Sequence, residues 1–205
     1  MNYRPLLVSV ALSALLSSCG PLALVNKNLR GGSDYLAGLG VTTPISPTTA
    51  NPAESSSFWD GDSLGGYPSI RIVRAEQKAY FYKSGELVGV SPISSGDSTH
   101  NTPAGSYKVT EKDIDHASSR YGQIVDVATG ATIIADADSQ KHKPAAGQKF
   151  VGAPMPYFLR FNWGIGMHAG HLPGYAASHG CVRMPRPMAR KFFEHAHLGT
   201  SVIVE

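Results

Sequence analysis

Short alternations of hydrophobic and polar residues, broken by turn residues, dominate the chain from about residue 69 onward. β-Branched and aromatic residues fill these runs, and segments such as Ser84-Gly85-Glu86 separate them, which is typical of strands joined by tight turns. We expect strands at 70–73, 79–82, 87–90, 107–109, 124–127, 133–134, 157–161 and 201–204. The more polar segments 111–120 and 136–148 lack this alternation, and we expect loops there.

One segment has the spacing of a helix instead. Between 185 and 198, Met188, Phe192 and Phe193 recur at helix-compatible intervals, with Ala196 following. Pro185 or Pro187 is suited to the first turn, and Gly199 to the end of the helix. The pattern therefore predicts a mainly β domain with one helix near its C-terminal end.

The N-terminal part of the chain has a different character. An apolar run at 6–16 is too short for an ordinary membrane-spanning helix and fits the core of a secretory signal peptide. Leu16-Ser17-Ser18-Cys19 looks like a bacterial lipobox, in which cleavage precedes a cysteine that then receives lipid. We therefore expect a signal peptide at 1–18 and lipidation of Cys19. A plain signal peptide, or a disulfide between Cys19 and Cys181, is the alternative.

The segment that follows, up to residue 57, is poor in aromatic residues and rich in Gly, Ser, Thr, Asn and Pro. Such a composition buries too little apolar surface to order itself, so we expect 19–57 to be the lipidated cysteine with a flexible tether. A flexible chain of this length has an end-to-end distance of roughly 35 Å. We expect residues 58–205 to form one domain.

Composition and charge narrow the class of protein. The 205 residues include 22 glycines and 14 prolines, which agrees with many turns, and the net charge of +3 is not clustered. Because there is no long run of Lys or Arg, we do not expect a nucleic-acid partner. Nothing in the sequence demands more than a monomer, and no cofactor is implied.

The candidate chemistry is concentrated at Ser178-His179-Gly180-Cys181-Val182-Arg183, with His168 upstream. Cysteine is a strong nucleophile as the thiolate, and a nearby imidazole promotes that form and returns the proton to a leaving group. A glycine before the thiol permits a tight turn, and we expect the amides of Gly180 and Cys181 to be free to face an oxyanion. The alternative is that Cys181 is a buried structural thiol.

These residues, with Met184 and a second motif at Asn101-Thr102-Pro103-Ala104-Gly105-Ser106-Tyr107, resemble the L,D-transpeptidase catalytic-domain family. These are bacterial cell-wall enzymes with a cysteine nucleophile, and the resemblance covers roughly 69–205. It implies a β-sandwich or barrel-like sheet with a helix against it, which is compatible with the strand pattern. It also implies a thioester on Cys181 and cross-linking of peptidoglycan stems.

The resemblance assigns roles to the residues around the thiol. His168 corresponds to the family's proton donor and acceptor, oriented by the backbone carbonyl of Ala169 rather than by an acid, and Asp and Glu are absent from 139–193. His179 has a supporting role, although a residue two positions from Cys181 on extended backbone could itself be the base. A core histidine is the alternative for His168. We expect His171 to lie in a loop near the site.

Two further residues are candidates for substrate binding. Arg183 resembles the family's contact to a substrate carboxylate, for which a guanidinium is well suited, although a solvated arginine at the helix entry is the alternative. We expect Ser178 to hydrogen-bond locally and hold the loop beside the substrate. The segments 111–120 and 136–148 are expected to shape the cleft.

The resemblance therefore implies a peptidoglycan L,D-transpeptidase that releases D-alanine from a tetrapeptide stem and joins two stems. An L,D-carboxypeptidase, an enzyme that anchors proteins to peptidoglycan, and an endopeptidase or amidase share the same site. A different class is a metal-binding lipoprotein, with His168, His171, His179 and Cys181 as ligands. We expect a lipid-anchored location in the cell envelope, facing the periplasm, and at the outer membrane of a Gram-negative cell because Gly20 is not aspartate.

Overall fold

The structure is a computed structural model that describes residues 56–205. The predicted signal peptide at 1–18, the lipidation site Cys19 and nearly all of the predicted tether at 19–57 lie outside the described residues. Within 56–205, no helix is both long and apolar enough to cross a membrane.

The largest sheet has six strands, which follow the alternation seen in the sequence. Its order is β1-β4-β3-β2-β13-β5, and β13 runs parallel to β2 but antiparallel to β5. Ile70 and Ile72 point into the core whereas Arg71 is exposed, as the twofold period of a strand requires. The strands are β1 (Phe58–Trp59), β2 (Pro68–Val73), β3 (Lys78–Lys83), β4 (Glu86–Pro92), β5 (Gly105–Lys108) and β13 (Ser201–Val204).

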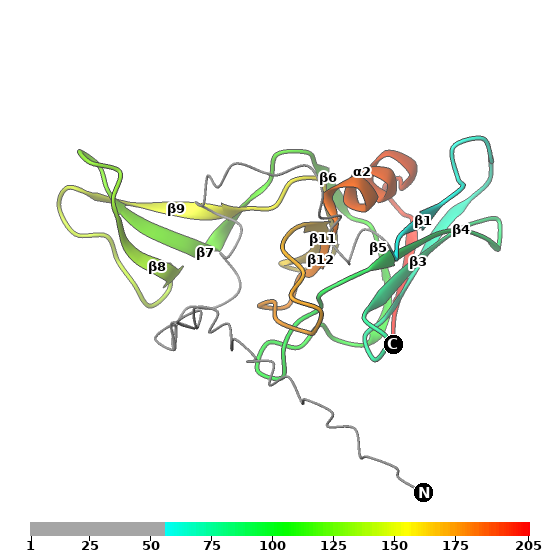
Figure 1. The fold of residues 1–205 in the computed structure, drawn as a ribbon, viewed down its shortest axis with the longest axis horizontal. Coiled ribbons are helices and arrows are strands. Elements are labelled where there is room, and N and C mark those ends of the chain that lie inside the picture. Colours follow the sequence, from blue (N-terminus) through cyan, green and yellow to red (C-terminus); the bar gives the residue numbers. More distant parts are fainter. Residues whose placement is uncertain (1–55) are drawn as a thin grey trace, which may run out of the picture. The chain divides into compact units, whose positions relative to one another are not determined.

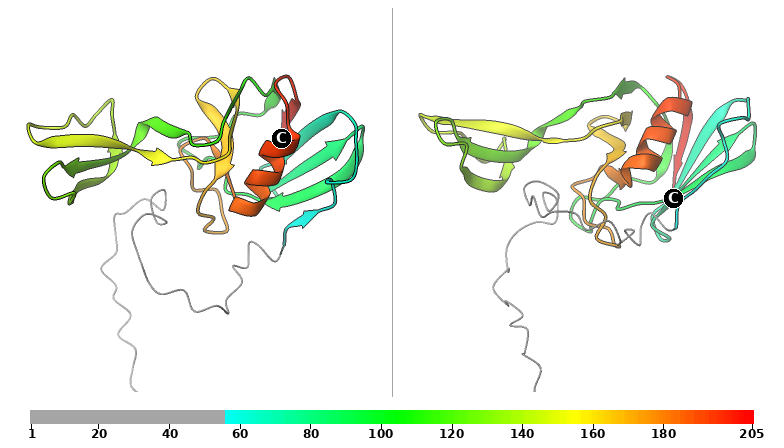
Figure 2. Two further views of the ribbon diagram at one scale, coloured as in Figure 1. Left: turned by 90° about the horizontal axis from the view of Figure 1, so that it is seen from above. Right: turned by 45° about the horizontal axis from the view of Figure 1, so that its top comes forward.

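A second sheet of four strands packs towards the first, with the helix between them (Figure 2). Its order is β12-β11-β10-β6, from β6 (Glu111–Asp113), β10 (Phe158–Asn162), β11 (Ile165–Ala169) and β12 (Val182–Met184). The helix α2 (Arg186–His195) has Pro185 as its N-cap residue, and Met188, Ala189 and Phe192 are buried. It ends before Ala196, earlier than the predicted stop at Gly199. One hydrophobic core joins both sheets and α2.

A third sheet extends to the side of these layers in Figure 1, in green and yellow. It is formed by β7 (Ala117–Asp126), β8 (Thr132–Asp138) and β9 (Gln148–Pro154), in the order β8-β7-β9. The prediction of loops at 111–120 and 136–148 is therefore wrong in part, because β6, the start of β7, the end of β8 and the first residue of β9 fall there. Much of this sheet is exposed, so its strands lack a buried side that would produce alternation.

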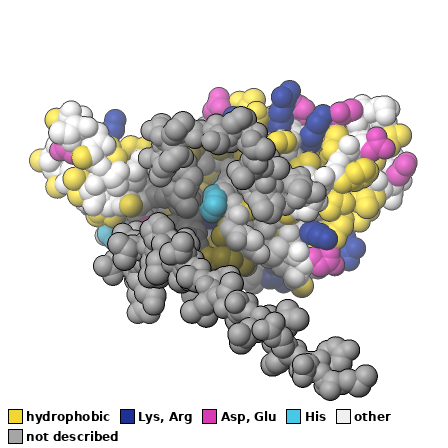
Figure 3. Space-filling model, in the orientation of Figure 1, with side chains coloured by type: hydrophobic (Ala, Val, Ile, Leu, Met, Phe, Trp, Pro, Cys, Tyr) yellow, Lys and Arg dark blue, Asp and Glu magenta, His cyan; other side chains and the backbone are white. Residues whose placement is uncertain are grey.

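The predicted class, mainly β with one helix after Cys181, is confirmed for the described residues. None of the three sheets in 56–205 closes on itself, so the layers form a sandwich and not a barrel. On the face in Figure 3, basic and acidic side chains are interspersed around α2.

Candidate active site

Cys181 lies directly before β12, at the end of the loop that leaves β11. The two strands are parallel neighbours, with Met167 opposite Val182 and His168 opposite Arg183. Met167 and Val182 are buried in the core, so strand alternation directs Cys181 and His168 to the other face of the sheet. Continuing the register by one residue makes them diagonal neighbours there, a separation that side chains can bridge.

The same face continues across β10 and β6. Arg160 on β10 is opposite Gly166 on β11 and Glu111 on β6, so the thiol, the glycine, the guanidinium and the carboxylate form one row. Arg160 Nε donates a 2.7 Å hydrogen bond to Glu111 Oε2. A Cβ atom on Gly166 would lie 2.6 Å from atoms of the Phe158 ring, so glycine is required where this ring crosses the sheet.

His168 is buried, with 3% of its surface exposed, and one ring nitrogen is held by the backbone. Nδ1 lies 2.9 Å from the Ala169 carbonyl, the contact that the family resemblance implied. Because a carbonyl only accepts, Nδ1 carries the proton and Nε2 is the basic nitrogen. Nε2 is buried and has no hydrogen-bond partner among the described residues. Burial lowers the pKa of His168 to about 4, the Ala169 contact opposes this, and the positive charge of Arg183 adds to it.

Cys181 carries a free, buried thiol that packs against Met155 and Phe158. Its Sγ lies 3.8 Å from the Gly164 carbonyl. Burial raises the pKa of the thiol, while the Gly166 amide and the charges of Arg160 and Arg183 act in the opposite direction. Since burial dominates for both groups, the thiol and the His168 imidazole are both neutral at neutral pH.

The loop before the thiol is held by buried hydrogen bonds. Ser178 Oγ donates to the Cys181 carbonyl and accepts the Gly180 amide at 3.1 Å. Thr102 Oγ1, from the second motif, donates to the Gly180 carbonyl at 2.7 Å. Gly180 has φ of +113°, a conformation that other residues rarely adopt.

Two of the predicted roles differ from this arrangement. The Gly180 amide is not free to face an oxyanion, because the Ser178 hydroxyl already accepts its hydrogen bond, and the Cys181 amide is the remaining candidate. Ser178 is fully buried and is not among the residues that line the cavity, so its position fits that of a residue that holds the loop. The sequence could not reveal that this one hydroxyl binds both groups.

Arg183 also differs from the prediction of a substrate contact. Its side chain is 1% exposed, and its guanidinium donates to the Ala177 carbonyl at 3.0 Å and the His171 carbonyl at 3.5 Å. It does not line the cavity. Arg183 thus ties the loop 171–177 to β12, and His171 contributes its backbone to this contact.

The thiol opens into a cavity of about 700 Å³ between the four-stranded sheet and the start of β7. Its charged lining residues are Arg120 and Arg160, and none of its lining residues is Asp or Glu. The lining includes both predicted residues His179 and Gly180, and also residues that sequence reasoning missed: His100, His116, Arg120, Tyr121 and Arg160. For His116 and Arg120, the sequence signal was the expectation that 111–120 shapes the cleft.

Three aromatic rings form one wall of the cavity. The His179 ring stacks on Tyr121 from β7, with centroids 4.4 Å apart. The His100 ring packs against His179 in a T-shaped arrangement, with centroids 4.6 Å apart. Burial lowers the pKa of His179. These contacts fix His179 as part of the wall, which fits a supporting role better than that of the base.

The four ligands of the metal-binding alternative are not gathered in the structure. Among the described residues, the group whose ligand atoms lie within 4.8 Å of one another is Glu111, Asp113 and His116. These residues are bonded already, since Glu111 accepts from Arg160 and His116 Nδ1 lies 3.0 Å from Asp113 Oδ2.

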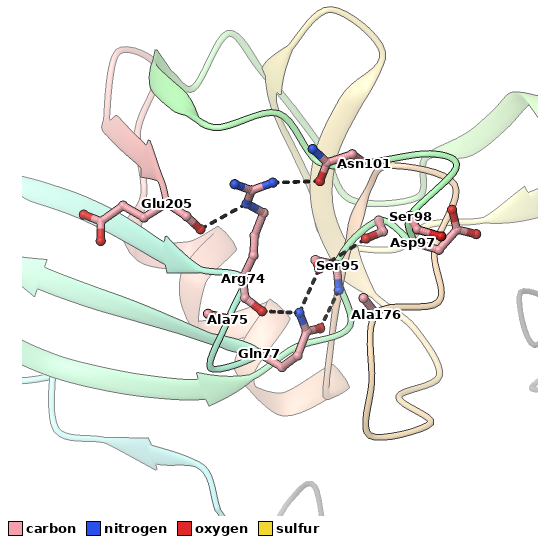
Figure 4. Close-up of a pocket in the computed structure, with 10 residues that line it drawn as sticks. Arg74, Ala75, Gln77, Ser95, Asp97, Ser98, Asn101, Ala176 and Glu205 are labelled. Carbon is pink, nitrogen blue, oxygen red and sulfur yellow. Dashed lines mark hydrogen bonds between the residues drawn. The ribbon is translucent and has the colours of Figure 1, made fainter.

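A smaller cavity of about 370 Å³ is lined in part by residues 95–98, the segment that supports the loop carrying the thiol (Figure 4). There, Gln77 hydrogen-bonds the amide and hydroxyl of Ser95, both at 2.9 Å, and Arg74 bonds Asn101 Oδ1 at 2.7 Å. The Ser95 carbonyl in turn accepts the amides of Ala177 and Ser178. These residues connect the six-stranded sheet to the loop that carries the thiol.

Comparisons with known proteins identify the family and agree with the fold. A family model described as the L,D-transpeptidase catalytic domain matches residues 68–204. Among solved structures, the chain is similar to a cysteine-to-serine mutant of an Enterococcus faecium L,D-transpeptidase, with 23% identity, a TM-score of 0.50, and coverage of 69% of this chain and 50% of that one.

For an L,D-transpeptidase from Mycobacterium smegmatis the identity is 16% and the TM-score 0.51, with coverage of 69% and 59%. For an L,D-transpeptidase in complex with imipenem, the values are 17%, 0.52, 69% and 60%. The chain thus spans between half and three fifths of these structures, and at such identities the likeness concerns the fold. A comparison with curated proteins finds no match.

Proposed function

Because the chain belongs to the family of L,D-transpeptidase catalytic domains, we propose that it is a peptidoglycan L,D-transpeptidase with Cys181 as nucleophile. The observation that carries this proposal is the pairing of Cys181 and His168 on one face of β11 and β12. The thiol faces a cavity of about 700 Å³, which is large enough for part of a peptide.

In the first half-reaction, His168 Nε2 takes the thiol proton and the Cys181 sulfur attacks the carbonyl that joins the diamino acid to terminal D-alanine. The bond to D-alanine breaks, its amine takes the proton from His168, and a thioester forms on Cys181. The neutral resting states of both groups support this order, because charge separation is then coupled to attack on the substrate. The Cys181 amide is the backbone donor for the oxyanion.

The charge of the cavity supports an acidic substrate. Peptidoglycan stems carry several carboxylates, and the cavity is lined by two arginines and by neither Asp nor Glu. Arg160 already pairs with Glu111, whereas Arg120 has 47% of its side chain exposed and a 3.3 Å contact to Asp138. We therefore assign the carboxylate contact to Arg120 in place of Arg183.

The second half-reaction resolves the thioester. An amine from a second stem gives a cross-link, water gives a tripeptide, and a lysine of an envelope protein gives covalent anchoring. We propose the stem amine as acceptor. The three outcomes share Cys181 and His168 and differ in the product.

The test is incubation of the full chain with disaccharide-tetrapeptide, followed by mass spectrometry of protein and products. We expect a dimer that lacks one D-alanine, absent with Cys181→Ala, and an adduct on Cys181 when imipenem is added. Tripeptide alone would favour the carboxypeptidase. Absence of any Cys181 adduct with either compound would refute the proposal.

We also propose that the protein is a lipoprotein of the cell envelope, anchored through Cys19. The lipobox-like sequence and the wall-directed family support this. In a cell fractionation, the wild type should remain with membranes and Cys19→Ala should not. Equal membrane association of both proteins would refute the anchor.

A further inference from the structure

A histidine that lines the same cavity as the thiol, His116, is paired with a carboxylate. His116 follows β6, and its Nδ1 lies 3.0 Å from Asp113 Oδ2. The other carboxylate oxygen of Asp113 accepts the Asp115 amide at 3.1 Å. The carboxylate is therefore oriented by the turn, and it orients the ring in turn.

Further contacts fix the position of His116 and its ring. It stacks on Phe158 with centroids 4.1 Å apart and an angle of 13° between the planes. The backbone of its loop is tied to the next one, because the Met155 amide donates to the His116 carbonyl at 2.7 Å. Phe158 and Met155 also pack against Cys181, so His116 stacks on a ring that itself contacts the Cys181 side chain.

His116 and His168 have opposite surroundings. His168 is buried, and its orienting partner is a neutral carbonyl. The His116 side chain is 19% exposed, lines the cavity and has a carboxylate as its partner. The other charged groups around His116 are Glu111 and Arg160, which pair with each other. The Phe158 ring, on which His116 stacks, also contacts the His168 ring.

This contrast matches a requirement of the second half-reaction. At neutral pH the acceptor amine is an ammonium ion, which cannot attack a thioester until it loses a proton to a base. His168 returns the proton to leaving groups, and its burial disfavours holding one. A histidine with a carboxylate and access to water can take that proton and release it.

We propose that His116, positioned by Asp113, is the base that deprotonates the acceptor amine, an inference that rests on the proposed function. His116 Nε2 takes one proton from the ammonium, and the amine lone pair then attacks the thioester carbonyl. A C–N bond forms and the C–S bond breaks. The second amine proton passes through His168 to the Cys181 sulfur, and His116 releases its proton to water.

The test compares both half-reactions in the full chain and in His116→Gln. With disaccharide-tetrapeptide, we expect thioester formation on Cys181 at nearly the wild-type rate in both. Transfer to the stem amine should be about 10²-fold slower in the variant, within the usual contribution of a general base. The thioester should accumulate, and the ratio of tripeptide to dimer should rise, because water needs no prior deprotonation.

A change of pH separates a base from a structural residue. Raising the pH increases the fraction of free amine, so transfer by His116→Gln should recover towards wild type in alkaline solution. Asp113→Asn, a second variant, should show a smaller defect with the same recovery. His195→Gln is the matched control, since His195 pairs with Asp62 at 3.2 Å outside the cavity.

Two results would overturn the inference while leaving the proposed function intact. One is an unchanged ratio of tripeptide to dimer in His116→Gln, and the other is equal slowing of acylation and transfer at every pH. A wild-type protein that forms no thioester would overturn the proposed function, and the inference with it.

Discussion

Replacing Thr102 with valine tests how the second motif supports the nucleophile. The Thr102 hydroxyl is fully buried, donates to the Gly180 carbonyl at 2.7 Å and accepts the Gly96 amide at 2.9 Å. The Gly180 carbonyl and the Cys181 amide belong to one planar peptide unit, so a fixed carbonyl fixes the direction of the amide. Valine keeps the shape and removes the hydroxyl.

The expected magnitude follows from the two backbone groups that lose their partner. Each buried, unsatisfied group costs about 1–3 kcal/mol, so we expect the free energy of unfolding to fall by about 3 kcal/mol. For a domain of this size, that lowers Tm by about 6–12 °C. Acylation of Cys181 by imipenem should also slow, by up to about 10²-fold, because the oxyanion donor is no longer directed.

Thermal unfolding and the rate of imipenem adduct formation measure both effects. Thr102→Ser retains the hydroxyl and should stay close to wild type. Thr132→Val makes the same chemical change at an exposed site on β8, where the hydroxyl contacts Gln123, and should change Tm little. Equal damage from the serine and valine variants, or a valine variant as stable and active as Thr132→Val, would refute the reasoning.

The alkylation rate of Cys181 by iodoacetamide should keep rising with pH through the neutral range, because burial raises the pKa of the thiol; a plateau at neutral pH would instead indicate a preformed thiolate. Burial lowers the folded-state pKa of His168 to about 4 from an ordinary 6.5, so the unfolded chain binds the proton first as the pH falls. As the pH falls from 6.5 to about 4, the free energy of unfolding of the wild type should fall by about 3 kcal/mol relative to that of His168→Gln, measured by denaturant titration. Parallel pH profiles of the two proteins would contradict this. Arg183→Met leaves the Ala177 and His171 carbonyls without their donor, so it should lower Tm and slow acylation by imipenem and iodoacetamide alike. A higher KM for the stem peptide with unchanged Tm would instead restore Arg183 as the carboxylate contact.

The parts of the fold that sequence reasoning found are those with one buried side. β2, β3 and β13 alternate because one face meets the core, and α2 has one apolar side for the same reason. β11 and β12 were missed because their residues are buried on both faces, which leaves no period in the sequence. The strands of the third sheet were found only in part, at 124–127 and 133–134, since most of the remaining residues of β7, β8 and β9 are exposed or half-buried and show no clear alternation.

The site divides along similar lines. Cys181 and His168 could be identified because their motif is local in sequence and its chemistry is distinctive. His116 and Arg120 could not, since their approach to the thiol depends on the pairing of β6 with β10, almost fifty residues later. The residue type of Arg183 suits a carboxylate, but only the folded loop reveals that its buried guanidinium donates to the Ala177 and His171 carbonyls.

His168 beside the thiol and His116 in the cavity suit opposite demands on a proton. Acylation needs a base that gives its proton quickly to the leaving amine, and a buried imidazole beside the Ala169 carbonyl holds a proton weakly. Transfer needs a base that takes a proton from the acceptor amine and passes it to water, and His116, oriented by Asp113, lines the cavity beside the thiol. An acid beside His168 would slow the return of the proton to the leaving amine. The absence of Asp and Glu from 139–193 and the Asp113–His116 pair on β6 and its loop therefore fit one division of labour.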